Sequence, residues 1–318
     1  PFFESFLLTT NFHASFVKEE SNEFNSLLNS TETSFYRLSD LPKKNQIDKN
    51  SSLFFYPKID RLFLNYLSTN LDIKLGRQAY SSGLAKIFPS SSMLFPTNLS
   101  NITSEYIPGH DGFSLAFDNL SLAQIEIVHL SSQLTSPEEG LSLIKLKSFK
   151  SGLTTEINLG SLSDNPFLGL ASQKTFTNSI FFFDYGLILL EEEGHNRLTL
   201  GGEYFFSSMS NILLEYHFNG IKQDLVNKLI KKKKSFKKQN PFFLKEKNYL
   251  SFIWNYTLHP LLQGTIQIIS KEKQKETLIS LNHSFNFMEN SYLELLLIHS
   301  TRNNSNIQKH NFYEWQDF

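Results

Sequence analysis

The sequence of 318 residues predicts an all-β fold, a transmembrane up-and-down antiparallel β-barrel of about 14–18 strands. Three observations predict this fold. Apolar and polar residues alternate through most of the chain, which is the period of a strand with two different faces. The alternating segments are about ten residues long, as a tilted strand that crosses a bilayer needs to be. Short and long connections follow one another, as in a meander whose tight turns lie at one end.

The composition excludes several classes of protein. The chain has no cysteine, which excludes disulfide scaffolds, thiolate metal sites and thiol nucleophiles. With 30 Lys and Arg against 31 Asp and Glu, it lacks the basic surface that a general nucleic-acid binder needs. No run of 18 apolar residues is present, so no membrane-spanning helix is predicted. Soluble folds and membrane β-barrels remain.

Alternation is clearest in six windows, in which Leu, Ile, Phe and Tyr on one face oppose Lys, Glu, Asn and Thr on the other. These windows are 71–78, 113–118, 153–160, 197–206, 211–219 and 249–258. Helical periods fit them poorly, and β-branched and aromatic residues are abundant. From 53 to 299 the pattern predicts about fourteen strands, and the segments 5–17 and 33–38 add one or two.

The connections between these strands divide into two sets. Short ones are predicted at 68–70, 119–120, 151–152, 207–210, 259–260 and 289–290, and long polar ones at 79–111, 131–140, 191–196, 220–247 and 300–311. No break in composition marks a boundary, so residues 1–318 are predicted to form a single barrel domain. We expect the sequence to be truncated at both ends, because it opens without Met or a leader and stops soon after a new apolar stretch begins.

A soluble β-sandwich would produce the same alternation, because it also buries one face of each strand. Strand length favours the membrane barrel, as does an apolar face made of Leu, Ile and Phe with Tyr and Trp towards the strand ends. The opposite face carries Lys, Glu, Arg, Asn and Gln, which suit a wet lumen better than a packed core. A sheet exposed to lipid must also close, because an open edge would leave unpaired backbone groups in hydrocarbon.

Three segments resemble a family of bacterial outer-membrane β-barrels related to alginate-export porins. Residues 72–78 (DIKLGRQ) are similar to its LxLGRQ strand, 107–115 (IPGHDGFSL) to its PGxDxxxL segment, and 200–220 to its GxxYxF … EYxxNG hairpin. The resemblance spans about 53 to 318 and implies an outer-membrane barrel. The chain departs from the family at 80–82 (YSS), where a Trp is usual, and at 88–90 (FPS), where an Asn-Pro turn is usual. These departures concern the family's substrate and not its barrel.

Charged and amide residues on the predicted lumen face are the candidates for solute selectivity. They are Lys74, Gln78, Glu126, Glu156, Arg197, Glu203 and Glu215. In a pore they would form rings of mixed charge that filter solutes. The alternative is that they pair across neighbouring strands and stiffen a narrow barrel.

Arg77 is a further candidate, because a guanidinium at a constriction favours anionic or hydroxyl-rich solutes. Strict alternation, however, places it on the same face as Leu75. Either Gly76 carries a bulge that turns Arg77 towards the lumen, or Arg77 lies beyond the bilayer and snorkels to the headgroups.

A Lys-rich segment occupies the predicted extracellular loop 220–247. Residues 222–247 contain ten Lys against Asp224 and Glu246, a local charge of +8. Such a cluster could hold lipopolysaccharide phosphates or attract an acidic solute, or it could be a solvated loop. Nucleic-acid binding is the weaker interpretation. Apolar residues at Ile221, Leu225 and Leu229 predict at most a short helix within this loop.

No motif for catalysis or for a cofactor is apparent. The nine His are scattered without the H-E-x-x-H spacing, and His110 beside Asp111 is interpreted as part of a turn. No G-x-S-x-G elbow and no phosphate-binding glycine loop is present. The sequence therefore predicts no enzyme, no catalytic residue, no metal and no cofactor.

These observations predict a bacterial outer-membrane channel for passive or facilitated diffusion of small polar or anionic solutes. We expect the long connection 79–111 to fold inward and constrict the pore. The competing hypotheses are a closed outer-membrane barrel with a structural or receptor role at the surface, and a secreted β protein that binds ligands. The partners expected are outer-membrane lipid, lipopolysaccharide and a small solute, and not nucleic acid; assembly into a homo-oligomer stays open.

Overall fold

The computed structural model describes residues 5–18, 45–46, 53–93, 109–120, 123–131, 140–162, 164–190, 193–221, 246–272, 277–288 and 291–301. The strand predicted at 33–38, the helix predicted after Ile221 and most of the Lys-rich loop 220–247 lie outside these residues. Within them, no helix is long and apolar enough to cross a membrane.

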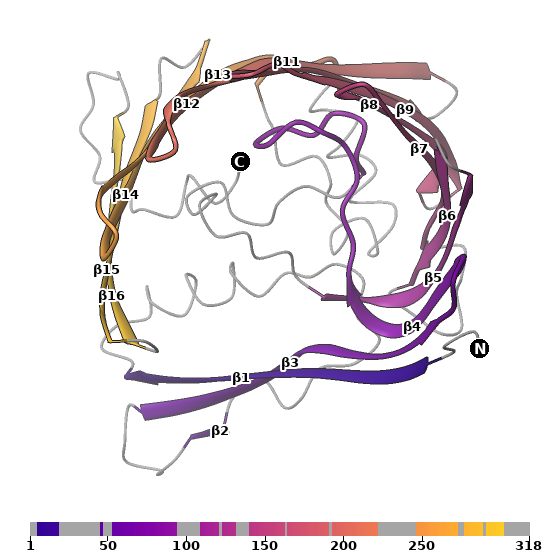
Figure 1. Ribbon diagram of the computed structural model, residues 1–318, viewed down its shortest axis with the longest axis horizontal. Helices are drawn as coiled ribbons and strands as arrows, with labels where there is room; N and C mark the ends of the chain where they lie inside the picture. The colour runs from indigo at the N-terminus through magenta and orange to yellow at the C-terminus, as the bar shows by residue number, and fades with distance from the viewer. Residues whose placement is uncertain are drawn as a thin grey trace.

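The structure consists of antiparallel strands joined in sequence order (Figure 1). They are β1 (Ser5–Lys18), β2 (Asn45–Gln46), β3 (Leu53–Leu67), β4 (Leu71–Ala79), β5 (Gly109–Leu120), β6 (Ala123–Leu130), β7 (Leu141–Lys150), β8 (Leu153–Leu162), β9 (Asn165–Thr175), β10 (Ser179–Leu190), β11 (Glu193–Ser207), β12 (Ser210–Asn219), β13 (Asn248–His259), β14 (Leu262–Lys271), β15 (Thr277–Met288) and β16 (Ser291–Thr301).

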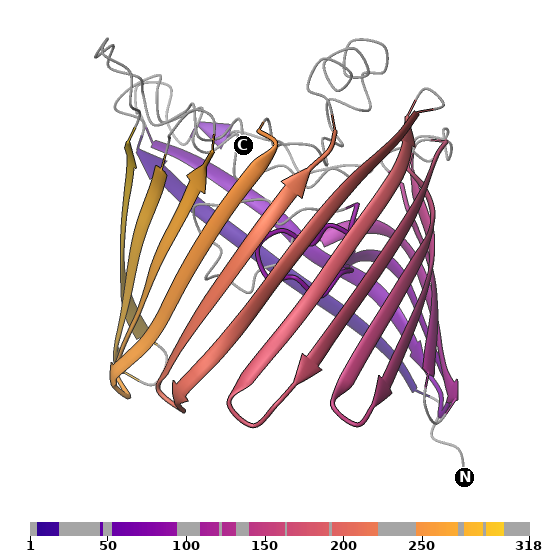
Figure 2. The same cartoon turned by 90° about the horizontal axis from the view of Figure 1, so that it is seen from above.

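The strands form one 16-stranded sheet that curves into a barrel (Figures 1 and 2). Its order is β1-β3-β4 and then each strand in turn to β16, while the short β2 pairs only with β3. The predicted all-β, up-and-down antiparallel barrel is thus confirmed, and its strand number lies within the range predicted.

Tight links join the strands at one end of the barrel, which we call the tight-turn end (Figure 2). They lie at 68–70, 151–152, 176–178, 208–209 and 260–261, and all but the link at 176–178 are close to where the sequence predicts turns. The long connection predicted at 191–196 is wrong, because β10 ends at Leu190 and β11 begins at Glu193. The prediction takes polar residues as the mark of a loop, but His195 and Arg197 are buried on the inner face of the barrel. This end of β11 is therefore a strand with polar inward residues.

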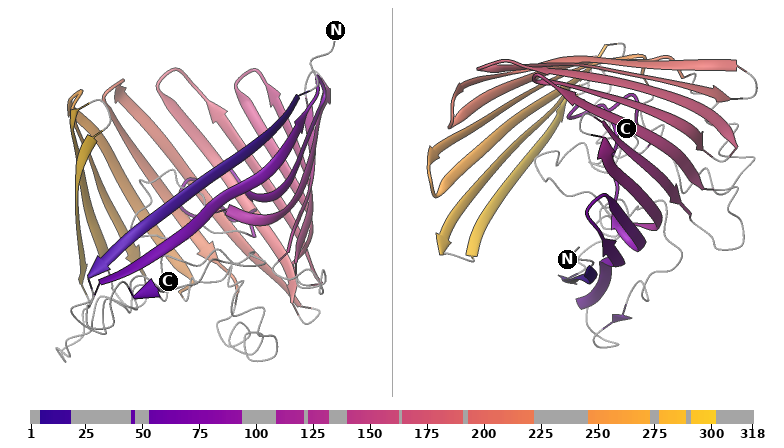
Figure 3. Two further views of the ribbon diagram at one scale, coloured as in Figure 1. Left: turned by 90° about the horizontal axis from the view of Figure 1, so that it is seen from below. Right: turned by 45° about the vertical axis from the view of Figure 1, so that its right-hand side comes forward.

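The seam between the first and last strands is the open part of the sheet. Without β2, the order contains fifteen strands, each antiparallel to the next, so β1 and β16 run in the same direction. Direct pairing between them would therefore be parallel. Figure 3 shows β1 and β16 close together at one end of the barrel and diverging towards the other. Among the described residues, the hydrogen-bonded order ends at these two strands.

The outer face of the barrel is apolar. Leu75, Phe181 and Leu250 expose 55% or more of their surface, which no soluble strand would do along a whole sheet. Aromatic pairs such as Tyr204–Phe206 and Trp254–Tyr256, with ring centroids 5.0 and 5.1 Å apart, lie on this face near the tight-turn end. An apolar band edged by aromatic rings is the surface that a bilayer requires.

The packed core lies inside the barrel, against one part of its wall. One cluster joins Tyr80 and Met93 to inward residues of β6–β10, and a second joins Ile87 and Phe88 to inward residues of β10–β15. Both clusters depend on residues 80–93, which follow β4 and lie within the barrel (Figure 1). We call residues 80–93 the inner segment.

Candidate functional site

The inner segment crosses the interior of the barrel and is held there by three buried carboxylates. Glu156 on β8, Asp184 on β10 and Glu215 on β12 are 3%, 0% and 1% exposed. They come from every second strand, so together they bracket five strands of wall. Each accepts hydrogen bonds from backbone N–H groups of the inner segment. Carboxylates on successive N–H groups form strong, charge-assisted hydrogen bonds.

Glu215 binds three consecutive N–H groups. Its Oε1 accepts from Lys86 at 2.7 Å and from Ile87 at 3.1 Å, and its Oε2 accepts from Ile87 at 3.1 Å and from Phe88 at 3.0 Å. Both oxygens are therefore used, and the backbone at 86–88 is fixed to β12.

Asp184 fastens two arms of the inner segment at once. Its Oδ2 accepts from the N–H groups of Leu84 at 2.8 Å and Ala85 at 3.1 Å on the outgoing arm. Its Oδ1 accepts from the N–H of Ser91 on the returning arm. Between the arms the chain turns at Pro89, whose carbonyl accepts from Ser92 N at 3.1 Å.

Carbonyl groups of the returning arm are held by a buried cation. Nη2 of Arg197 on β11 donates to the carbonyls of Ser90 at 2.9 Å and Ser92 at 2.7 Å, and the side chain is 1% exposed. Thr199 donates to the carbonyl of Phe88, and His217 stacks on the Phe88 ring at a centroid distance of 5.0 Å. Acidic groups thus bind the N–H side of the backbone and a basic group binds the C=O side.

Two inward glycines allow the backbone of the inner segment to pack directly against the wall. Gly169 on β9 and Gly186 on β10 are cross-strand partners. A Cβ at Gly169 would lie 2.5 Å from the carbonyl oxygen of Ser91, and one at Gly186 would overlap the carbonyl oxygen of Ser90. Only glycine lets the backbone approach the wall this closely.

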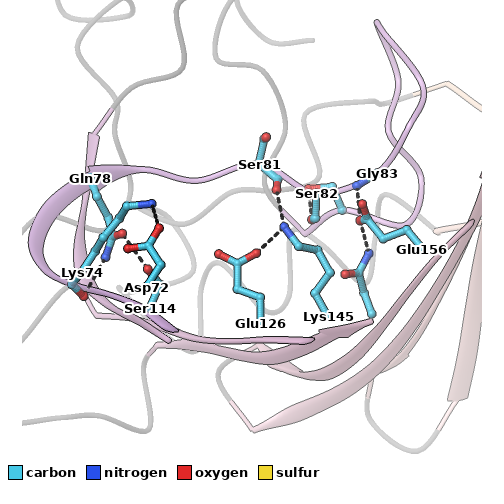
Figure 4. A network of polar contacts seen from close by, with 12 residues as sticks. Asp72, Lys74, Gln78, Ser81, Ser82, Gly83, Ser114, Glu126, Lys145 and Glu156 are labelled. Atoms are coloured by element: carbon cyan, nitrogen blue, oxygen red, sulfur yellow. Dashed lines mark hydrogen bonds and ion pairs between the residues drawn. The ribbon is translucent and has the colours of Figure 1, made fainter. Parts of the chain in front are cut away.

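A second polar network covers the wall of β4–β8 (Figure 4). Lys145 on β7 forms an ion pair with Glu126 on β6 at 2.5 Å, contacts the carbonyl of Ser81 at 3.5 Å, and lies 5.0 Å from the centre of the Tyr80 ring. Lys74 pairs with Asp72 at 2.8 Å. Figure 4 shows these side chains on the same side of the wall as the inner segment.

The remaining contacts in this network are short and local. Ser114 donates to Gln78 at 2.9 Å, and Gln78 is 3% exposed. Because Lys74 and Lys145 each have an acidic partner within 2.8 Å, the two charges of each pair largely cancel at a distance.

The structure places the predicted selectivity residues in three groups. Glu156, Arg197 and Glu215 hold the inner segment. Lys74, Gln78 and Glu126 belong to the wall network of Figure 4. Glu203 accepts a hydrogen bond from Asn211 on the neighbouring strand. For all of them, an effect on solute selectivity stays a prediction.

Arg77 is buried, and snorkelling is the wrong alternative. Its Nε and Nη2 donate to the two carboxylate oxygens of Asp111 at 2.8 and 2.9 Å, and Nη1 donates to the carbonyl of Ile59 at 2.8 Å. Gly76 has φ +120°, a conformation open to glycine, but the registers of β4 with β3 and β5 continue through it without a shift, so the predicted bulge is not present. Arg77 thus ties β3, β4 and β5 together. The prediction that His110 and Asp111 form a turn is wrong, because both lie within β5.

The sequence did not single out Asp184, Lys145, Thr199 or His217. The signal for Asp184 is a single carboxylate inside the apolar run 180–190, on the same parity as the inward Phe182. The inward course predicted for 79–111 is confirmed for 80–93; residues 94–108 lie outside the described part. In the part of the chain that the structure describes, no three acidic or His residues converge as a metal site would require.

Comparison with known proteins gives no match to a protein-family model, and no curated protein matches the sequence. Solved structures do match in fold. OccAB4 of Acinetobacter baumannii is 12% identical with a TM-score of 0.54, covering 94% of this chain and 81% of that one. OpdK of Pseudomonas aeruginosa, solved with vanillate, is 11% identical with a TM-score of 0.53, covering 94% and 84%. OccAB1 of A. baumannii is 10% identical with a TM-score of 0.50, covering 80% and 73%.

The fold is that of outer-membrane β-barrel porins. At 10–12% identity the likeness concerns the architecture only.

Proposed function

We propose that this protein is a bacterial outer-membrane channel through which small polar solutes diffuse down their gradients. The observation that carries the proposal is the inner segment, which is fastened inside the barrel by Glu156, Asp184 and Glu215. A segment fixed along one wall narrows the interior without requiring any moving part. Such a constriction filters solutes by size and by the groups that face it.

The outer face supports the membrane location. Its exposed Leu and Phe side chains would contact lipid, and its aromatic pairs would lie at the headgroup level. The closed barrel that serves as a surface structure or receptor is the second candidate, favoured by the two packed clusters that fill part of the interior. A role without catalysis is part of the proposal.

Kinship with the alginate-export porins, contact of the Lys-rich loop with lipopolysaccharide phosphates, and assembly into homo-oligomers also belong to the proposal. Kinship is supported by the segment 72–78, which resembles the family's LxLGRQ strand. In β4, Gly76 has a positive φ, Arg77 bonds Asp111 and Gln78 bonds Ser114. The loop would contribute a charge of +8 over residues 222–247.

Planar-bilayer recording of the refolded protein tests the channel. Discrete conductance steps are expected, and a refolding mixture without protein is the control. If no steps occur over a range of voltages although the protein inserts into liposomes, the closed barrel is the better interpretation. A protein that stays soluble without detergent would overturn both interpretations.

A further inference from the structure

One wall of the barrel interior carries a single charged residue. In β13, β14 and β15 the only Asp, Glu, Lys or Arg is Lys271, at the end of β14 remote from the tight turns. Towards the tight-turn end, the inward residues of these strands carry amides and hydroxyls. They are Asn255, Thr257, Gln263, Thr265, Asn282 and Ser284, which we call the neutral wall.

Alternation and register place these side chains inside. Asn255, Thr265 and Asn282 have the same parity as Ile253, Ile269 and Leu278, which pack against the inner segment. Pairing of Asn255 with Thr265, and of Thr265 with Asn282, puts the three side chains in one row across three strands. All six residues of the neutral wall are partly or fully exposed, so solutes can reach them.

The neutral wall can both donate and accept hydrogen bonds. Thr265 Oγ1 donates to Asn255 Oδ1 at 2.8 Å, which fixes the orientation of the Asn255 amide and directs its nitrogen, a donor, away from that contact. Sugars and polyols carry hydroxyls that need donors and acceptors together. An ion passing the same wall would lose hydration and gain no countercharge.

Most charges elsewhere on the described inner face are matched; the exceptions are Glu203 on β11, which accepts from the neutral amide of Asn211, and Lys147 on β7, which lies over the Phe149 ring. Glu156, Asp184, Glu215 and Arg197 bind the inner segment and are buried. In the ion pairs of the β4–β7 wall the lysine nitrogen lies 2.5 or 2.8 Å from the carboxylate oxygen, so each pair presents a dipole and not a net charge to a solute.

We infer that the channel takes uncharged, hydroxyl-rich solutes, which bind along the neutral wall of β13–β15. This inference rests on the proposed channel function and narrows its range of polar solutes to neutral ones. The neutral wall is then the specificity-determining surface.

Solute entry into proteoliposomes tests the inference with D-glucose and D-glucuronate, which differ by one carboxylate. The wild-type protein is expected to admit glucose several-fold faster than glucuronate. Replacing Asn255→Leu together with Asn282→Leu keeps the side-chain volume and removes the amides. It is expected to raise the glucose concentration for half-maximal entry about tenfold, the factor that two lost neutral hydrogen bonds correspond to.

A matched control is Gln124→Leu, an amide of β6 on the ion-pair side of the interior. It is expected to leave glucose entry at the wild-type rate. Because the double variant could fail to insert, Thr265→Val provides a second test, since it removes one hydroxyl with no change of shape. Ion conductance of each variant is recorded first, which shows that the barrel is inserted.

The outcomes separate this inference from the channel proposal. Conductance with faster entry of glucuronate than of glucose would overturn the neutral-solute inference and leave the channel in place. Equal effects of Gln124→Leu and of the neutral-wall variants would show that solutes do not bind the neutral wall, which also overturns it. Absence of conductance and of entry in the wild-type protein would overturn the channel itself, and the inference with it.

Discussion

The substitution Glu215→Gln should release part of the inner segment from the wall. In the wild-type protein both carboxylate oxygens accept N–H groups of residues 86–88, at 2.7 to 3.1 Å, in a site that is 1% exposed. A glutamine keeps one acceptor and places an NH₂ donor where the other oxygen was. The N–H group of Lys86 or of Phe88 then faces a donor and loses its only acceptor, while the N–H of Ile87 keeps the remaining oxygen.

A hydrogen bond to a charged group contributes about 1.5–3 kcal/mol, so losing this one costs about 1.5–3 kcal/mol. Each 1.4 kcal/mol is a factor of ten in population, so the population of the detached state rises by roughly one to two orders of magnitude. Asp184 and Arg197 still hold the neighbouring residues, so the segment should loosen at 86–88 while its ends stay attached.

Single-channel recording is the assay, and larger conductance with added fluctuation of the open level is the expected result. Trypsin provides a second readout, because the peptide bond after Lys86 lies in the released stretch. Glu203→Gln is the matched control, since Glu203 is an inward carboxylate of the adjacent strand that is bonded to Asn211. Conductance and cleavage at Lys86 that stay unchanged in Glu215→Gln would refute the reasoning, as would equal changes in the control.

Three further changes test other parts of the structure. Gly186→Ala introduces a Cβ that overlaps the Ser90 carbonyl and should cost about 1–3 kcal/mol, seen as a lower thermal midpoint in detergent; Gly194→Ala, whose new Cβ has its nearest neighbour at 3.5 Å, should change nothing. Asp111→Asn leaves the buried Arg77 guanidinium without its carboxylate and should lower the free energy of unfolding in urea by about 3–5 kcal/mol. A variant as stable as the wild-type protein would contradict a stabilising role of the Arg77–Asp111 ion pair. Lys145→Gln leaves Glu126 unpaired and should shift the reversal potential in a KCl gradient towards cation selectivity, whereas an unchanged potential would place this pair away from the ion path.

The sequence was enough to predict the strands, because alternation is a local property of each strand. Period 2 in 153–160 or 249–258 needs no knowledge of the partner strands, and those windows lie in β8 and β13. The same reasoning failed at the start of β11, where the wall residues that meet the inner segment are themselves polar. His195 and Arg197 there are inward and buried, so polarity no longer marks the exposed face.

Contacts of the inner segment could not be predicted from local pattern. Asp184 and Leu84 are 100 residues apart in sequence, and their hydrogen bond depends on how many strands lie between them and on the register of each pair. The parity of Glu156, Arg197 and Glu215 identified them as inward residues, which the structure bears out. Parity alone does not tell a free lumen charge from one that is bound to a folded segment.

The order of the anchors follows the course of the outgoing arm across the wall. Neighbouring strands lie about 4.8 Å apart, so Glu156, Asp184 and Glu215 stand on strands separated by about 9–10 Å. An extended chain advances about 3.3 Å per residue, and the outgoing arm meets these strands first at Gly83, then at Leu84 and Ala85, and then at 86–88.

The outgoing arm therefore runs across the strands, where it has no neighbouring strand to pair with. Its backbone N–H groups need acceptors inside the barrel, since buried unpaired groups are costly. An inward carboxylate can satisfy two or three of them at once, whereas an amide or hydroxyl would satisfy fewer. The acidic residues of this wall are thus required by the backbone of the inner segment, and the charge that remains available to a solute must be sought on the other strands.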